Sequence, residues 1–228
     1  MTLSRLARRA AGTARWAVLS AALIGATTQT ASALPSGHGY AFDRGPSGGV
    51  STAAFPKWTG AMGRNWAHKG VSESVCNGKM GRNCGLDRWR SFLSELDGLA
   101  PIRQLRRINA FVNQTRYRSD SKVWGRSDYW AAPGEFFARG GDCEDYAIAK
   151  YYSLKSQGFA ADDMRIVVLK DTARNLLHAV LVVKHGGRTL VLDNLSSRVK
   201  EWKDLPNYKP LYSVNEKNYW LHPGLKSI

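Results

Sequence analysis

Two apolar segments joined by paired glycines constrain the fold of this chain more than any other feature. They cover residues 178–183 and 189–193, with Gly186-Gly187 between them. Both carry apolar side chains at odd and even positions alike, a pattern typical of strands that are covered on both faces. We therefore expect a central antiparallel hairpin with other structure packed on each side.

The segments before this hairpin predict helices, and those around it predict further strands. Apolar residues at helical spacing predict helices over 86–99, from Pro101 onward, and from about 143 to 157. A strand is predicted over 164–169, and edge strands over 211–214 and 218–221. Aromatic residues spaced irregularly through 115–140 indicate loops that line a cleft. Helices followed by strands are typical of an α+β domain.

The first 33 residues have the pattern of a secretory signal. A basic start without acids precedes an apolar stretch, and Ala31-Ser32-Ala33 suits signal peptidase. The apolar stretch is shorter than the ~20 residues that span a bilayer, which disfavours an uncleaved anchor. We expect residues 1–33 to be a signal peptide, 34–60 a flexible Gly/Ser/Pro-rich leader, and 61–228 one domain in the periplasm.

The chain is strongly basic. Its net charge is +15, and removal of the expected signal, which holds four arginines and no acid, leaves +11. A basic surface is either simply solvated or attracts acidic protein and the cell envelope. Nucleic acid is not an expected partner of an exported protein, and no organic cofactor is indicated.

Three cysteines divide into a pair and a single thiol. Cys76 and Cys84 lie eight residues apart in a polar, Gly-rich stretch. In an oxidising compartment they are expected to form a small disulfide loop, whereas zinc binding is less favoured because no His lies nearby. Cys143 is left over, and an odd cysteine in an exported protein is a candidate nucleophile.

Cys143 lies in Gly140-Gly-Asp-Cys-Glu-Asp-Tyr146, where a loop is expected to run into a helix. At a helix start, free backbone N–H groups and the dipole stabilise a thiolate. The glycines permit a sharp turn and close approach of a substrate backbone. Asp142 and Glu144 oppose this effect, because carboxylates beside a thiolate raise its pKa. They either bind a cation such as Ca²⁺, which prefers oxygen ligands, or form a helix-capping, solvated cluster.

His178 is the best candidate for the base, with Asp193 to orient it. If the hairpin turn is His185-Gly186, the two stand directly opposite one another. If the turn is Gly186-Gly187, they are diagonal neighbours on the same face. A slip of one residue would separate them onto opposite faces. An Asp in this position orients the imidazole and stabilises its charged form.

These motifs resemble the bacterial transglutaminase-like cysteine proteinase family. The resemblance rests on Asp128-Tyr-Trp, Pro133-Gly-Glu135, Gly140-Gly-Asp-Cys-Glu-Asp-Tyr-Ala147, His178-Ala-Val and Leu192-Asp193-Asn194. It implies a papain/transglutaminase-like fold with the nucleophile helix packed on a central antiparallel sheet. It also implies that Cys143, His178 and Asp193 form a catalytic triad.

The same resemblance has implications for metal and partners. In the characterised branch of the family, periplasmic proteases cleave large surface adhesins near a di-alanine and release biofilm. They require calcium held in part by acids flanking the cysteine, here Asp142 and Glu144. An inner-membrane receptor responding to cyclic di-GMP sequesters them.

We therefore expect an exported cysteine endopeptidase. The backbone N–H of Cys143 is expected to contribute to the oxyanion hole, with Trp130 as a second donor. Two rival hypotheses remain. A transglutaminase would transfer the acyl group to an amine, and a non-catalytic envelope module would only grip a peptide in its cleft.

Overall fold

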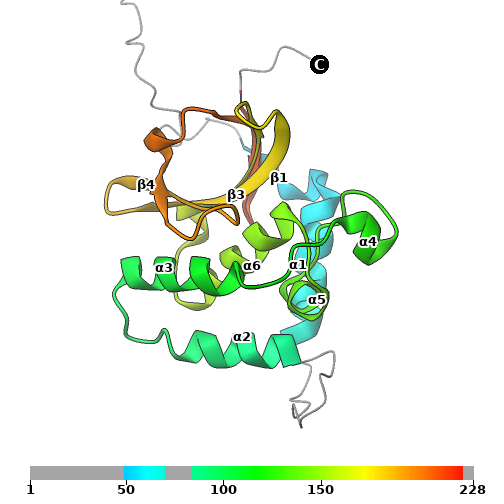
Figure 1. Ribbon diagram of the computed structural model, residues 1–228, viewed down its shortest axis with the longest axis vertical. Helices are drawn as coiled ribbons and strands as arrows, with labels where there is room; N and C mark the ends of the chain where they lie inside the picture. The colour runs from blue at the N-terminus through cyan, green and yellow to red at the C-terminus, as the bar shows by residue number, and fades with distance from the viewer. Residues whose placement is uncertain (1–48, 70–83, 223–228) are drawn as a thin grey trace, which may run out of the picture. The chain divides into compact units, whose positions relative to one another are not determined.

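Antiparallel strands form one curved sheet, and the helices gather below it in the view of Figure 1. The computed structural model describes residues 49–69 and 84–222. Within them the strand order is β1-β7-β6-β2-β3-β4-β5. The bounds of these strands are β1 Val50–Ser51, β2 Met164–Asp171, β3 Leu176–His185, β4 Arg188–Leu192, β5 Lys200–Glu201, β6 Tyr208–Val214 and β7 Asn218–Leu221.

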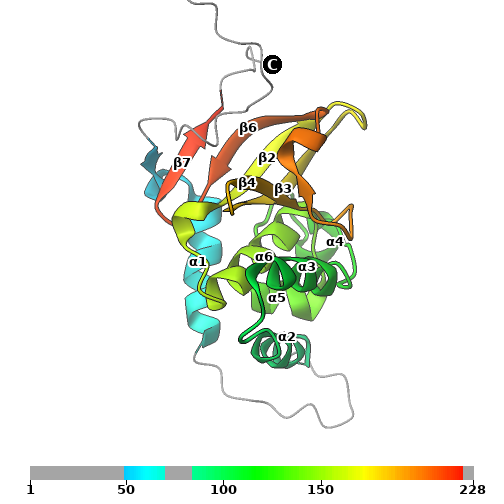
Figure 2. The ribbon, with the colours of Figure 1, turned by 90° about the vertical axis from the view of Figure 1, so that its left-hand side faces the viewer.

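The helices form successive layers beneath the sheet. Their bounds are α1 Pro56–Lys69, α2 Cys84–Ser94, α3 Pro101–Val112, α4 Asp120–Trp124, α5 Pro133–Arg139 and α6 Cys143–Ser156. Helix α6 packs against β2 and β3, while α3 and α5 contact α6 and α2 contacts α5 (Figure 2). The predicted α+β class is confirmed. Within the described ranges, none of the helices combines the length and apolar character needed to cross a bilayer.

Alternating apolar side chains give the central strands two buried faces, as predicted. Ile166 and Leu181 share one core with α6, whereas Val167 and Val180 belong to a second core on the concave side. The second core is completed by Trp202 and Leu205, between β5 and β6, and by Tyr208, the first residue of β6. Burying both faces of a strand removes apolar surface from water on each side, which explains the near-continuous apolar runs.

The hairpin of β3 and β4 turns at Gly186-Gly187. His185 pairs with Arg188, and Leu181 pairs with Leu192. Both glycines have positive φ, 56° and 70°, which a two-residue hairpin turn requires. This is the second of the two registers considered from the sequence, and it makes His178 and Asp193 diagonal neighbours.

Part of the predicted flexible leader is ordered. Val50 pairs with Tyr219 of β7, and α1, which is not predicted from the sequence, begins at Pro56 within the expected leader. Trp58 is fully buried, and its indole N–H donates to the Asn215 carbonyl at 2.9 Å. The prediction was wrong here because the Gly- and Ser-rich composition obscured two aromatic anchors, Phe55 and Trp58. The signal-peptide prediction and residues 34–48 of the leader lie outside the described residues.

Three other local predictions need correction. Helix α2 ends at Ser94, not residue 99, and Gly98 has a left-handed φ of 73°. The segment 115–140 contains two short helices, α4 and α5, rather than loops alone. Helix α5 starts at Pro133, and the Glu135 side chain accepts a hydrogen bond from the Ala132 N–H there. Strands β6 and β7 are interior rather than edges, because β6 lies between β7 and β2 and β7 lies between β1 and β6.

Candidate active site

Cys143 is the first residue of α6, as the sequence predicts. The chain enters the helix through Gly140, whose φ of 79° favours glycine, and Gly141, where a Cβ would lie 2.1 Å from Asp145 Oδ2. The Arg118 N–H donates to the Gly141 carbonyl at 2.9 Å. These contacts therefore hold the backbone that leads into Cys143 in one conformation.

Asp145 anchors this helix start rather than acting in the cleft. It is fully buried, and its Oδ1 accepts a bond from the Ala131 N–H at 2.7 Å. Its Oδ2 accepts one from the Asp142 N–H at 3.2 Å. The carboxylate thus joins the aromatic loop before α5 to the first turn of α6 and satisfies two backbone donors that no helix bond uses.

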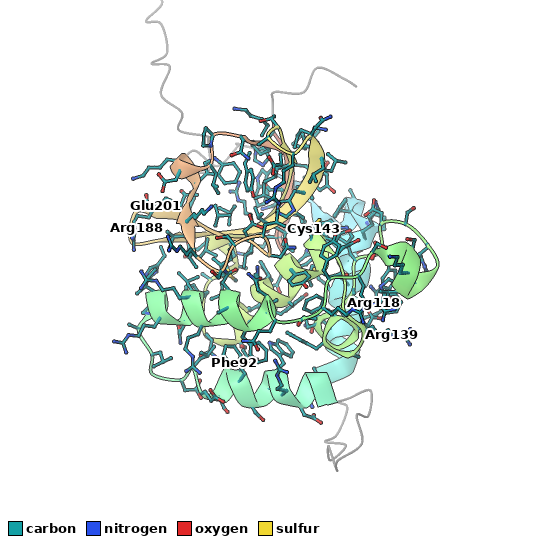
Figure 3. All side chains as sticks on the ribbon, in the orientation of Figure 1. Phe92, Arg118, Arg139, Cys143, Arg188 and Glu201 are labelled. Atoms are coloured by element: carbon teal, nitrogen blue, oxygen red, sulfur yellow. The ribbon has the colours of Figure 1, made fainter. Side chains whose placement is uncertain are left out.

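A cleft of about 470 Å³ opens at the start of α6, and Cys143 and His178 both line it. Cys143 lies centrally, between the sheet and the helices, in Figure 3. The cleft is completed by Phe55, Lys57, Asp128, Trp130, Glu144, Val168, Leu177, Ala179, Leu211 and Tyr212. Its mostly apolar walls and few polar groups are typical of a small-molecule or peptide site.

His178 and Asp193 lie together, as predicted. His178 Nε2 is 2.9 Å from Asp193 Oδ1, and both side chains are buried. Asp193 also accepts the Leu195 N–H at 2.9 Å and the hydroxyl of Tyr208 at 2.6 Å. Burial alone would raise the pKa of Asp193, but the bonds and charge of His178 and the bond from Tyr208 outweigh it and lower the pKa to about 2.

Tyr208 is a site residue that sequence reasoning missed. Its ring packs edge-on against the His178 ring, with centroids 5.9 Å apart. It lies on β6, which is separated from β3 by β2. A tyrosine in a strand is an ordinary core residue, so nothing in the sequence distinguished it.

The thiol of Cys143 is bonded to a carboxylate rather than to the imidazole. The Sγ–H of Cys143 donates to Glu144 Oε2 at 3.2 Å. The ring of His178 packs against the ring of Tyr208. Burial first, then the charges of Glu144 and Asp142, raise the pKa of the thiol well above its usual value. The backbone N–H of Ala179, next to His178, opposes this rise.

Three carboxylates crowd beside the thiol. Oxygens of Asp120, Asp142 and Glu144 lie within 4.8 Å of one another. Burial and mutual repulsion raise the pKa of Asp120 to about 6 and that of Asp142 to about 8. One buried oxygen each of Asp120 and Asp142 has no hydrogen-bond partner. This all-oxygen donor set with unpartnered atoms suits a hard cation.

Asp120 is the member of this cluster that the sequence did not reveal. It opens α4, more than twenty positions before Asp142, and an acid at a short helix start is common. Its other oxygen accepts the Tyr129 N–H at 2.5 Å. That bond holds the carboxylate where the loop folds back on α6.

The expected second oxyanion donor is engaged elsewhere. The indole N–H of Trp130 donates to Asp128 Oδ1 at 3.2 Å, although the ring lines the cleft. The expected disulfide is not described, because Cys76 and the side chain of Cys84 lie outside the described part of the chain.

Comparison with known proteins identifies the family. The model of the bacterial transglutaminase-like cysteine proteinases, BTLCP, matches residues 76–224. The chain belongs to this family. No curated protein matches the chain.

Solved structures of Legionella pneumophila LapG share the fold. One shows 29% sequence identity and a TM-score of 0.57, covering 72% of this chain and 88% of LapG. A calcium-bound form of LapG gives the same identity and TM-score, covering 78% of this chain and 91% of LapG. An EGTA-treated form also matches, at the same identity and TM-score. The transglutaminase-like α+β fold is therefore confirmed.

Proposed function

We propose that this chain is an exported cysteine endopeptidase that uses Cys143, His178 and Asp193. One observation carries the proposal: a cysteine at a helix start and a histidine bonded to a buried carboxylate line one cleft, in a chain of a cysteine proteinase family. Asp193, with its lowered pKa, remains ionised and orients the imidazole through Nε2. Nδ1 is then the nitrogen that exchanges a proton with the thiol.

In the proposed reaction the proton of Cys143 moves to His178 and the thiolate attacks a peptide carbonyl. The backbone N–H of Cys143 stabilises the oxyanion. The amide C–N bond breaks as the imidazolium gives its proton to the leaving amine. Water then attacks the thioester, with His178 as base, and releases the second fragment together with the free thiol.

The thiol must exchange its bond with Glu144 for one with His178 before this reaction. A calcium ion held by Asp120, Asp142 and Glu144 would supply positive charge where three carboxylates now repel one another. The calcium-bound LapG structure supports this proposal. We include calcium dependence in the proposed function on these grounds.

The proposed substrate is a cell-surface or envelope protein such as a large biofilm adhesin, and the proposed compartment is the periplasm. An inner-membrane receptor would regulate the protease there. The resemblance of the motifs to the adhesin-cleaving branch supports these three statements.

The decisive experiment mixes the purified protein with outer-surface proteins of its own cell. The wild type should release fragments in calcium, and Cys143→Ala should release none. Cleavage by the alanine variant would remove the nucleophile assignment, and cleavage unaffected by EGTA would remove the calcium requirement.

Cross-linking of a Gln peptide to a primary amine would instead indicate a transglutaminase. A thiol that reacts with a peptide electrophile no faster than free cysteine would indicate a binding module.

A further inference from the structure

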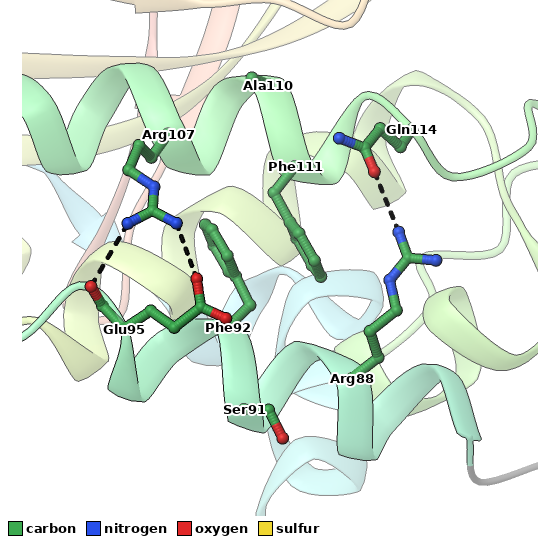
Figure 4. A pocket seen from close by; sticks show the side chains of 8 residues that line it. All are labelled: Arg88, Ser91, Phe92, Glu95, Arg107, Ala110, Phe111 and Gln114. Carbon is green, nitrogen blue, oxygen red and sulfur yellow. Dashed lines mark hydrogen bonds and ion pairs between the residues drawn. The ribbon is translucent and has the colours of Figure 1, made fainter.

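Two adjoining hollows form a continuous groove away from the cleft. One, of about 440 Å³, lies between α2 and α3 (Figure 4), and the other, of about 320 Å³, reaches α5 and Gly140. They share Arg88, Phe111 and Gln114 in their walls. We call the two together the arginine groove.

The groove concentrates positive charge. Five guanidinium groups line it, those of Arg88, Arg107, Arg116, Arg118 and Arg139. One carboxylate faces them, that of Glu95, and it is bound to the Arg107 Nη2 at 2.7 Å. Within the described part of the chain, the other four arginines form no ion pair with a carboxylate. The groove therefore carries about four uncompensated charges.

Several of these guanidinium groups are held in place by neutral contacts. Arg88 lies over the Phe111 ring at 5.2 Å and donates to Gln114 at 3.0 Å. Arg139 lies over the Trp124 ring at 5.0 Å. A stacked guanidinium keeps its planar edge free for a carboxylate and loses little freedom on binding one.

The floor of the groove is aromatic but covered. Phe92 and Phe111 stack with centroids 3.9 Å apart, and Phe92 is buried. Rings that face each other and lie under arginines cannot stack on nucleic-acid bases. Small apolar side chains can still pack beside them. The combination therefore favours a peptide in which carboxylates alternate with apolar residues.

We propose that the arginine groove binds an acidic segment of a protein partner. The groove reaches Gly140, three residues before Cys143, and Arg118 and Arg139 lie below Cys143 in Figure 3. A partner bound there would approach the start of α6 without entering the cleft. This site goes beyond the proposed proteolysis and does not depend on it.

The test measures binding rather than cleavage. The full chain carrying Cys143→Ala is titrated into a fluorescein-labelled peptide that alternates Asp and Leu, with a Lys-Leu peptide for comparison. The acidic peptide should bind and the basic one should not. Combining Arg116→Gln with Arg139→Gln should weaken binding about tenfold, because two exposed charge pairs with the peptide are lost.

A matched variant separates the groove from overall charge. Arg188→Gln with Arg198→Gln removes the same charge from a different hollow, beside β4 and β5, and should change the affinity less than about twofold. Equal weakening by both pairs would overturn the proposal, as would no binding of the acidic peptide. Displacement of the peptide by an oligonucleotide of equal charge would show a general polyanion site and would also overturn it.

Discussion

The two sides of the candidate active site, on the sheet and at the start of α6, satisfy their polar atoms very differently. On the sheet, Asp193 receives bonds from His178, Tyr208 and Leu195, and its pKa falls to about 2. At the helix, Asp120 and Asp142 keep unpartnered oxygens, and their pKa values rise.

The two sides of the site thus differ in whether their carboxylate oxygens have hydrogen-bond partners. Asp193 accepts hydrogen bonds on both of its oxygens, so the carboxylate is held in place and can orient the imidazole. Crowded carboxylates with unused oxygens are costly until a cation or protons neutralise them. The sheet side is therefore held by its own hydrogen bonds, whereas the proposed calcium ion would neutralise the carboxylates of the helix side.

The largest expected effect comes from breaking the sheet side. Asp193→Asn should reduce alkylation of Cys143 by a peptide electrophile about 10²–10⁴-fold, because the amide no longer orients and stabilises the imidazolium. Mass spectrometry of samples quenched at successive times would give the alkylation rate. Asp204→Asn, an exposed carboxylate, is the control. A loss below about threefold for Asp193→Asn would contradict the triad.

Helix α6 also contains a buried titratable group, Lys150. Its side chain is fully buried, its Nζ has no hydrogen-bond partner among the described residues, and burial lowers its pKa to about 7 despite attraction from Asp193. Below pH 7 the lysine is charged in both folded and unfolded chains, so the burial cost is complete. Between pH 7 and about 10.5 the unfolded chain binds more protons, so stability should rise with pH.

Lys150→Met should therefore stabilise the protein by about 3 kcal/mol at pH 6 and by less at pH 9. Chemical denaturation at the two pH values measures the difference. Lys122→Met, at an exposed position, should change stability little at either pH. Destabilisation by Lys150→Met at pH 6 would mean that the ammonium has a stabilising role.

Removing one acid should test the helix side directly. Asp120→Asn should weaken calcium binding about 10–100-fold, since it replaces a charged ligand with a neutral one. Isothermal titration calorimetry measures the affinity, and exposed Asp163→Asn serves as the control. Equal affinities for wild type and Asp120→Asn would place the cation elsewhere.

The smallest expected effect comes from Tyr208→Phe. Loss of the hydroxyl leaves one oxygen of Asp193 without its donor and should cost about 1–2 kcal/mol of stability. Alkylation of Cys143 should slow about threefold to tenfold as the Asp193 carboxylate loosens. Tyr219→Phe is a suitable control, because its hydroxyl makes no hydrogen bond within the described residues. An unchanged alkylation rate would limit Tyr208 to a packing role.

Much of this site follows from local patterns in the chain. The Gly-Gly-Asp-Cys motif predicts a helix that begins at Cys143, and the paired glycines predict the hairpin that brings His178 near Asp193. Both predictions hold because each depends on bonds between residues close in sequence. The ordered residues 50–60 were missed because Trp58 is anchored by Asn215, far along the chain.

The amino-acid sequence by itself determined the place of Cys143 at a helix start, the His178–Asp193 pair on one hairpin and the α+β class. Only the tertiary structure decided that Asp120 joins Asp142 and Glu144, and that the Tyr208 hydroxyl donates to Asp193. These contacts join segments whose separation along the chain carries no periodic signal. They arise when separate elements pack, so burial and shape, rather than local pattern, select the partners.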